Sequence, residues 1–212
     1  MAGWCSADIE GEAEALYKAA GIDSSQGAAP AWLAVRILGP GSVVRVHSLM
    51  HAGGGCLTRV LGAPRIYYRS SLAPQRADFV VAHELAHWAL GTRLTEDEND
   101  IESACDALAA ALIAPRRAFL DAVRAYGTRL PRLARAFQTT ESLTALRLGE
   151  TTGEPLALVA PRSVRVRGAM YSWPGESQLR ALAAARRSGP GLRNTRLRDD
   201  PRRTVLRAVG EF

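Results

Sequence analysis

The segment His83-Glu84-Leu85-Ala86-His87 holds the residues of this chain that are best suited to metal chemistry. Residues four apart share one face of an α-helix, so the imidazoles of His83 and His87 can point at one metal ion. Glu84 lies beside His83, where a carboxylate can reach a metal-bound water and act as a general base. The alternative is a chance match on an ordinary buried helix. Two histidines and a glutamate at this spacing are rare by chance at average composition.

A catalytic zinc site needs a third protein ligand and leaves a fourth position for water. The next helical segment offers Glu102 and, one turn later, Asp106. We predict that Glu102 binds the metal and that Asp106 accepts the free ring N–H of a metal-bound histidine. A surface acid in a helical first turn is the alternative for Glu102. Rival acids precede it and are more typical of a solvated helix N-terminus. They are Glu96, Asp97, Glu98 and Asp100.

Local patterns predict the elements that must position these residues. The motif lies on a helix over 75–90, because Pro74 suits its first turn and Gly91 its C′ position. The other predicted helices are 8–20, 30–38, 99–113, 116–126, 131–137 and 141–148, and the strands are 42–47, 56–61 and 65–68. After Pro155 the pattern predicts a β-hairpin, with strands 156–160 and 163–167, then a helix over 176–187. The Gly/Pro/Arg-rich stretch 188–203 is typical of a loosely ordered segment.

These motifs together resemble the ImmA/IrrE family of metallo-endopeptidases. The resemblance rests on the HExxH helix, the acidic loop, Glu102 with Asp106, and the Ala-rich run that ends at Pro115. It covers residues 8–150, with Ala86 standing where glycine is common in the family. It implies an α+β zincin-like fold, with a small mixed β-sheet and a mostly helical active-site half. It further implies a Zn²⁺ cofactor and a protein substrate, a helix-turn-helix repressor that is cleaved to relieve repression.

Charge and texture divide the chain. Residues 1–115 hold 8 Lys+Arg and 13 Asp+Glu, net −5, whereas residues 116–212 hold 19 Arg and 8 Asp+Glu, net +11. We predict a metallopeptidase domain over 1–150 and a basic C-terminal appendage over 151–212 that recruits substrate. A coding bias toward arginine is the blander explanation of the charge.

Several roles stay open at the level of sequence. Tyr67, Tyr68 and His47 are candidates for a second donor to the oxyanion, while His47 and His51 are more typical of ordinary polar residues near a turn. A peptide substrate could add to a sheet edge at 56–61. Residues 131–149 could form a helix-turn-helix that binds DNA, but its second helix offers few basic groups.

Two other functional classes compete with a peptidase. One is a regulatory DNA- or protein-binding module with a structural zinc site, and the other is a toxin partner of a repressor-type antitoxin. An intact Glu84 argues against a purely structural site, which needs no general base.

Cysteine usage and the absence of targeting signals predict a cytoplasmic protein. Cys5, Cys56 and Cys105 are odd in number and scattered, as is typical of reduced thiols. The N-terminal residues lack a basic region followed by an apolar one, so we expect no signal peptide. No apolar run reaches membrane-spanning length, and we expect no membrane partner.

Overall fold

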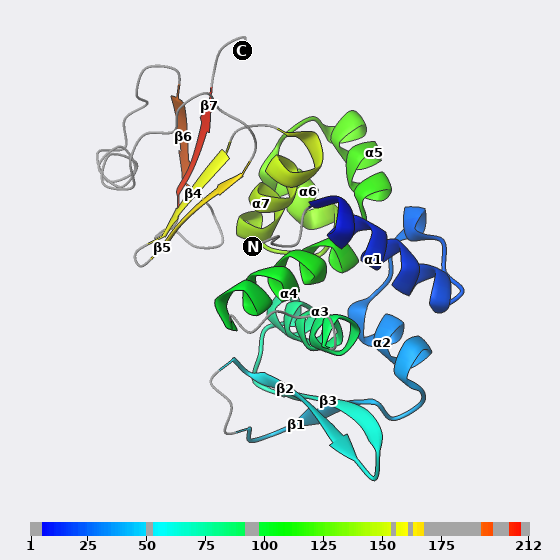
Figure 1. Cartoon of the computed structure of the whole chain (residues 1–212). Helices are drawn as coiled ribbons and strands as arrows, with labels where there is room; N and C mark the ends of the chain where they lie inside the picture. The colour runs from blue at the N-terminus through cyan, green and yellow to red at the C-terminus, as the bar shows by residue number, and fades with distance from the viewer. Residues whose placement is uncertain are drawn as a thin grey trace. The chain divides into compact units, whose positions relative to one another are not determined.

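The computed structural model describes residues 6–49, 53–91, 98–153, 156–160, 163–167, 192–196 and 204–208. The fold is α+β, as predicted, with helices and a small mixed sheet (Figure 1). The chain divides into two compact units, Met1–Ala118 and Phe119–Phe212. The division of function between residues 1–150 and 151–212 stays a prediction.

The first unit combines helices with a three-stranded sheet. Its elements are α1 (Ser6–Ala19), the 3₁₀ turn η1 (Ser24–Gln26), α2 (Pro30–Leu38), β1 (Val43–Val46), β2 (Gly55–Val60), β3 (Ala63–Arg69), α3 (Pro74–Leu90) and α4 (Glu98–Ile113). Prolines occupy the first turns of α2 and α3, where a missing N–H costs nothing. Gly21 and Gly39 follow α1 and α2 with φ of 71° and 97°, a region that only glycine enters cheaply. Sequence and structure therefore agree on these helix ends.

The sheet of the first unit is mixed. The strand order is β1-β3-β2, with β1 parallel to β3 and β2 antiparallel to it. Gly55 pairs with Tyr68 and Val60 with Ala63, so β2 and β3 form a hairpin closed by Leu61 and Gly62. One edge of β2 carries no neighbouring strand within the described sheet. A strand edge of this kind offers unpaired backbone groups to another chain.

Helix α3 is the central element of the first unit. It packs against α2, α4 and the strands β2 and β3, and in Figure 1 it lies between the sheet and α4. Leu85 and Leu90 on α3, Ile66 on β3, and Leu108 on α4 are each 0% exposed. Burying these side chains stabilises the unit by roughly 1.5–3 kcal/mol each, before the entropy of ordering them is subtracted. The core therefore fixes the rotation of α3 and α4 about their axes.

The second unit joins helices to a four-stranded antiparallel sheet. Its elements are α5 (Arg116–Tyr126), α6 (Leu130–Ala136), α7 (Glu141–Thr152), β4 (Leu156–Ala160), β5 (Ser163–Arg167), β6 (Leu192–Arg196) and β7 (Thr204–Ala208), and the sheet order is β5-β4-β7-β6. Helix α7 packs against α6, β4 and β5. Leu156, Ala157 and Val205 are at most 2% exposed. Within the described ranges of the chain, no helix is long and apolar enough to cross a membrane.

The predicted β-hairpin is confirmed in both strands, and Leu156 pairs with Arg167. The expectation of a loose stretch over 188–203 is wrong for β6, and the sequence also missed β7. Leu192-Arg-Asn-Thr-Arg196 has little strand propensity of its own. It becomes a strand by pairing with β7, a contact that no local pattern reveals. The predicted helix over 176–187 lies outside the described residues.

Two glycines play other roles than the sequence suggests. Helix α7 continues through Gly149 to Thr152, because Gly153 provides the left-handed cap with φ 72°. Gly91 ends α3 with a right-handed backbone, φ −50° and ψ −29°, rather than a left-handed one. A Cβ on Gly91 would lie 2.8 Å from the carbonyl oxygen of His87, so close backbone approach requires glycine there.

Candidate metal centre

Helix α3 presents both histidines of the motif on one side. Their Nε2 atoms lie 3.1 Å apart, and their ring centroids are 4.8 Å apart in an edge-on arrangement. Leu85 and Ala86, which lie between the two histidines on the same helix, are each 0% exposed. The side chains of His83 and His87 retain 15% and 25% exposure. The core therefore holds α3 in the orientation that turns both imidazoles toward α4 and toward solvent.

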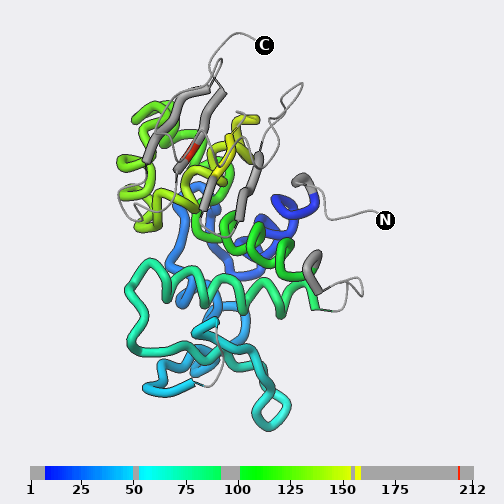
Figure 2. Tube along the Cα trace, turned by 90° about the vertical axis from the view of Figure 1, so that its left-hand side faces the viewer, coloured from blue at the N-terminus to red at the C-terminus, as the bar shows by residue number. Residues whose placement is uncertain are grey.

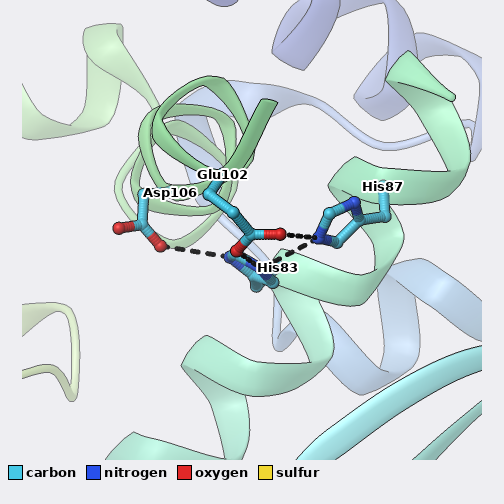
Figure 3. A network of polar contacts seen from close by, with 4 residues as sticks. All are labelled: His83, His87, Glu102 and Asp106. Carbon is cyan, nitrogen blue, oxygen red and sulfur yellow. Dashed lines mark hydrogen bonds and ion pairs between the residues drawn. The ribbon is translucent and has the colours of Figure 1, made fainter. Parts of the chain in front are cut away.

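Helix α4 supplies the acids. Ala104, Cys105 and Leu108 are buried, and this apolar side fixes the helix beside α3. Oε2 of Glu102 lies 3.3 Å from Nε2 of His83, and its Oε1 lies 3.1 Å from Nε2 of His87 (Figure 3). The structure thus brings Glu102, on the next helix of the chain, to the two histidines.

The donor atoms of His83, His87 and Glu102 fit a metal ion. All three offer a ligand atom within 4.8 Å of the others, and the close pairs are 3.1 to 3.3 Å apart. Zinc bonds of about 2.0–2.1 Å in a tetrahedron place neighbouring donors roughly 3.3–3.4 Å apart. The two imidazole nitrogens therefore lie close to the spacing of two corners of a zinc tetrahedron, and the Glu102 carboxylate, with one oxygen near each histidine, lies within reach of a third. Two imidazoles with one carboxylate also match the ligand set of catalytic zinc, which leaves one corner for water.

Asp106 lies behind His83, on the side away from Glu102. Its Oδ1 is 3.1 Å from Nδ1 of His83, a contact shown by the dashed line in Figure 3. The distance between the buried Nδ1 and the Asp106 carboxylate is that of an ion pair, but the angle of the contact is not that of a good hydrogen bond. Burial lowers the pKa of His83, but the nearby carboxylates, Asp106 foremost, outweigh it and hold that pKa above 6.5. A carboxylate placed here favours the tautomer that leaves Nε2 free for a metal.

Glu84 faces the beginning of β2. A Cβ built on Gly55 would lie 3.1 Å from Oε1 of Glu84 and 2.2 Å from Cγ1 of the buried Val80. Only glycine therefore allows the strand to approach α3 so closely. Gly55 precedes the strand that the sequence predicts over 56–61, and nothing in the local pattern points to this contact. The free edge of β2 thus starts beside the acid of the motif.

The remaining candidates are less closely tied to this centre. His47 lies after β1, where its Nδ1 is 3.4 Å from Oγ of Ser70. Tyr67 and Tyr68 are half-buried in β3, and no contact of theirs with the centre assigns either one as an oxyanion donor. His51 and the rival acids Glu96 and Asp97 lie outside the described residues, as do the side chains of Glu98 and Asp100.

Two cysteines are described, and both are free thiols. Cys105 is 0% exposed in α4, as expected of a small buried hydrophobic residue, and burial raises its pKa to about 12. Cys56 in β2 is half-buried, and burial, followed by the charge of Glu84, raises its pKa as well. Both thiols are therefore held in the neutral form, which is a poor metal ligand.

The second helix of the predicted helix-turn-helix is almost entirely enclosed. Helices α6 and α7 are joined by a short turn, and Thr140 caps α7 by accepting a hydrogen bond from the backbone N–H of Leu143 at 3.2 Å. Thr144 and Arg147 are each 1% exposed. Polar side chains buried in this way cannot reach the edges of DNA bases.

Comparisons with known proteins show the family and the fold of the chain. The model of the IrrE N-terminal-like domain, Peptidase_M78, matches residues 40–149, which is just over half of the 212 residues. No curated protein matches the chain. A solved structure, a Mycobacterium tuberculosis transcriptional regulator, is similar with a TM-score of 0.61 and 16% sequence identity. The likeness covers 89% of this chain and 64% of the regulator, and it demonstrates a shared fold.

Proposed function

Because the chain belongs to the Peptidase_M78 family of IrrE N-terminal-like domains, we propose that it is a zinc-dependent endopeptidase. The observation that carries the proposal is the cluster of His83, His87 and Glu102, whose donor atoms lie close enough together to bind one metal ion such as zinc. Asp106 would orient His83 from behind through its contact with Nδ1. A metallopeptidase is the activity that the family suggests, and zinc is the metal that this ligand set suits.

In this proposal the chemistry needs one proton carrier, and Glu84 has that role. A zinc ion, when bound, would polarise the peptide carbonyl and lower the pKa of a water molecule. Glu84 accepts a proton from the water molecule as the water oxygen bonds to the carbonyl carbon of the peptide. It then delivers that proton to the nitrogen as the C–N bond breaks, which releases an amine and a carboxylic acid. The carboxylate is unchanged at the end of the cycle.

The edge of β2 offers a place for the substrate backbone. Its first residue, Gly55, lies against Glu84, and the strand then continues to Val60 with one edge unpaired by any described strand. An extended peptide could pair with this edge through main-chain hydrogen bonds, as in other strand-addition complexes. A peptide held this way would pass beside Glu84, which supports an endopeptidase that acts within a chain.

We propose a helix-turn-helix transcriptional repressor as the protein substrate, cleaved to relieve repression. The proposal rests on the family resemblance, and the structural likeness to a transcriptional regulator is consistent with a role in gene control. A cytoplasmic location belongs to the same proposal, because a repressor acts there and both described cysteines are free thiols.

The likeness to a transcriptional regulator also favours a second candidate. The chain would then be a regulatory module that binds DNA or a protein and keeps zinc for structure. The enclosed side chains of α7 argue against DNA binding through that helix. A related possibility is a toxin that binds a repressor-type antitoxin. In neither case would the carboxylate of Glu84 be needed.

The deciding experiment compares Glu84→Gln with the original chain. Both proteins, purified without chelator and analysed for metal, are incubated with the helix-turn-helix repressor encoded nearest to the gene. We expect equal zinc content and equal folding, with cleavage reduced by at least 100-fold in the variant. Glu14→Gln, the same change on an exposed position of α1, is the matched control and should cleave normally. Cleavage by Glu84→Gln at the normal rate would refute the mechanism.

A further inference from the structure

The tip of the β2–β3 hairpin exposes apolar side chains to solvent. The hairpin tip consists of Val60, Leu61 and Gly62. Leu61 is 103% exposed and Val60 is 37% exposed. The hairpin projects away from the rest of the first unit in both Figure 1 and Figure 2. Leaving a leucine fully in water forgoes the roughly 1.5–3 kcal/mol that its burial would contribute.

Leu61 is also held in an unfavourable backbone conformation. Its φ is 52° and that of Gly62 is 83°, and the pairing of Val60 with Ala63 closes a two-residue loop between them. Positive φ at both central residues is the pattern of a type I′ turn, which strongly prefers Asn, Asp or Gly. Leucine is neither suited to this turn nor buried by it. The exposed side chain and the positive φ of Leu61 are therefore two independent unfavourable features, and neither of them stabilises the fold.

The sequence around the hairpin carries positive charge only. Between Ser24 and Ala77 there is no aspartate or glutamate, and there are six arginines, namely Arg36, Arg45, Arg59, Arg65, Arg69 and Arg76. Arg59 is exposed on β2 just before the tip. Arg65, opposite Thr58 on β3, donates to the neutral backbone carbonyl of Gly41, and within the described part of the chain it forms no ion pair with an acid. The apolar tip therefore stands on a basic stem.

The same strand connects this tip to the metal centre. Gly55 lies against Glu84, and Leu61 follows six residues later. At about 3.3 Å per residue the tip is roughly 20 Å along β2 from that acid. An extended peptide paired with the edge of β2 would span this distance with about six residues.

We infer that the hairpin tip and its arginines form a distal substrate-binding site that selects an acidic segment with an apolar residue, about six residues from the cleaved bond. The inference rests on the proposed peptidase function. Leu61 and Val60 would contact the apolar residue of the substrate, while Arg59 and Arg65 attract neighbouring carboxylates. The strand that leads from this site to Glu84 favours a peptide segment of the substrate as the occupant over a membrane surface.

The test uses cleavage-site profiling with a peptide library from a bacterial proteome digest and zinc-loaded full-length protein. Peptides cleaved by the original chain should be enriched in Asp or Glu beside an apolar residue, about six positions from the cut. Leu61→Asn should abolish the apolar enrichment and lower kcat/KM for the best enriched peptide by about 10-fold. It should leave a truncated peptide lacking the distal segment unaffected. Arg59→Gln should weaken the acidic enrichment and the salt dependence of KM.

Three comparisons make the result decisive. Leu61→Met keeps an apolar side chain and should retain the enrichment. Trp32→Gln removes an exposed apolar residue elsewhere in the first unit and should leave the enrichment unchanged. Leu61→Asn should unfold at the same temperature or higher, since asparagine suits the turn, which separates docking from stability.

Cleavage without distal enrichment, or an unchanged profile for Leu61→Asn, overturns the distal site alone. No zinc-dependent cleavage at all refutes the peptidase and the distal site with it. The alternative is binding of the protein to anionic phosphatidylglycerol vesicles. If Leu61→Asn abolished that binding and left the peptide profiles unchanged, the hairpin tip would be a membrane-binding site and the substrate site would be refuted.

Discussion

Replacing Asp106 with alanine tests whether this carboxylate orients His83, one of the proposed metal ligands. Nδ1 of His83 is buried and lies 3.1 Å from Oδ1 of Asp106. Without that carboxylate, the ring N–H would lose its nearest acceptor and the imidazole its orientation. Removing such a partner typically weakens metal binding by about 10- to 100-fold, which corresponds to roughly 1.4–2.7 kcal/mol. The cost of leaving a buried polar group without a partner, about 1–3 kcal/mol, falls in the same range.

Chelator competition measures this effect directly. Zinc affinity is determined for the original chain, for Asp106→Ala and for His87→Ala, with circular dichroism to verify folding. We expect about one zinc per chain originally, a 10- to 100-fold weaker affinity for Asp106→Ala, and loss of binding for His87→Ala, because it removes a donor atom. Asp121→Ala, at an exposed acid on α5, is the control and should bind zinc normally. Equal affinity in Asp106→Ala and the original chain would refute the orienting role, and absence of zinc in the original chain would refute the metal site itself.

The remaining predictions concern stability. Tyr17→Phe should lower the free energy of unfolding by about 1–3 kcal/mol in urea, because the buried Tyr17 hydroxyl donates to the carbonyl of Leu112 at 2.7 Å and accepts from the N–H of Ala28 at 3.1 Å; an unchanged midpoint would contradict this. The pKa of His83 is raised above 6.5, so its protonation stabilises the metal-free protein at low pH and this contribution is lost as pH rises through the folded pKa. Zinc-loaded protein should become more stable as pH rises, because protons compete with zinc for the ligands. Thermal unfolding from pH 5 to 8, measured once with chelator and once with zinc, distinguishes the metal-free from the zinc-loaded protein. The same pH dependence of the unfolding temperature in both samples would count against a metal at His83. Truncation after Thr152 removes β4 and β7, whose Leu156 and Val205 are buried, so we expect the second unit to lose cooperative unfolding while zinc binding persists; a fragment as stable as the full chain would instead support a separable appendage.

The sequence by itself determines the local part of the candidate metal centre. The spacing of His83 and His87 places both on one helical face by geometry alone, and the prolines and glycines at the helix ends mark α2 and α3 within a residue. The same is true of the β4–β5 hairpin, which depends on short-range contacts. Such features are set by residues close together in the chain, so local patterns reveal them.

Only the tertiary structure decides which distant groups meet these residues. Several acids follow the motif, and Glu102 reaches the histidines because the buried side of α4, with Cys105 and Leu108, sets its rotation against α3. Gly55 meets Glu84 through the packing of a sheet on a helix, and β6 becomes a strand through pairing with β7. The exposure of Leu61 is equally invisible in the sequence, where it resembles the other apolar residues of a strand. Each of these outcomes depends on packing between segments far apart in the chain, and local propensity carries no information about such contacts.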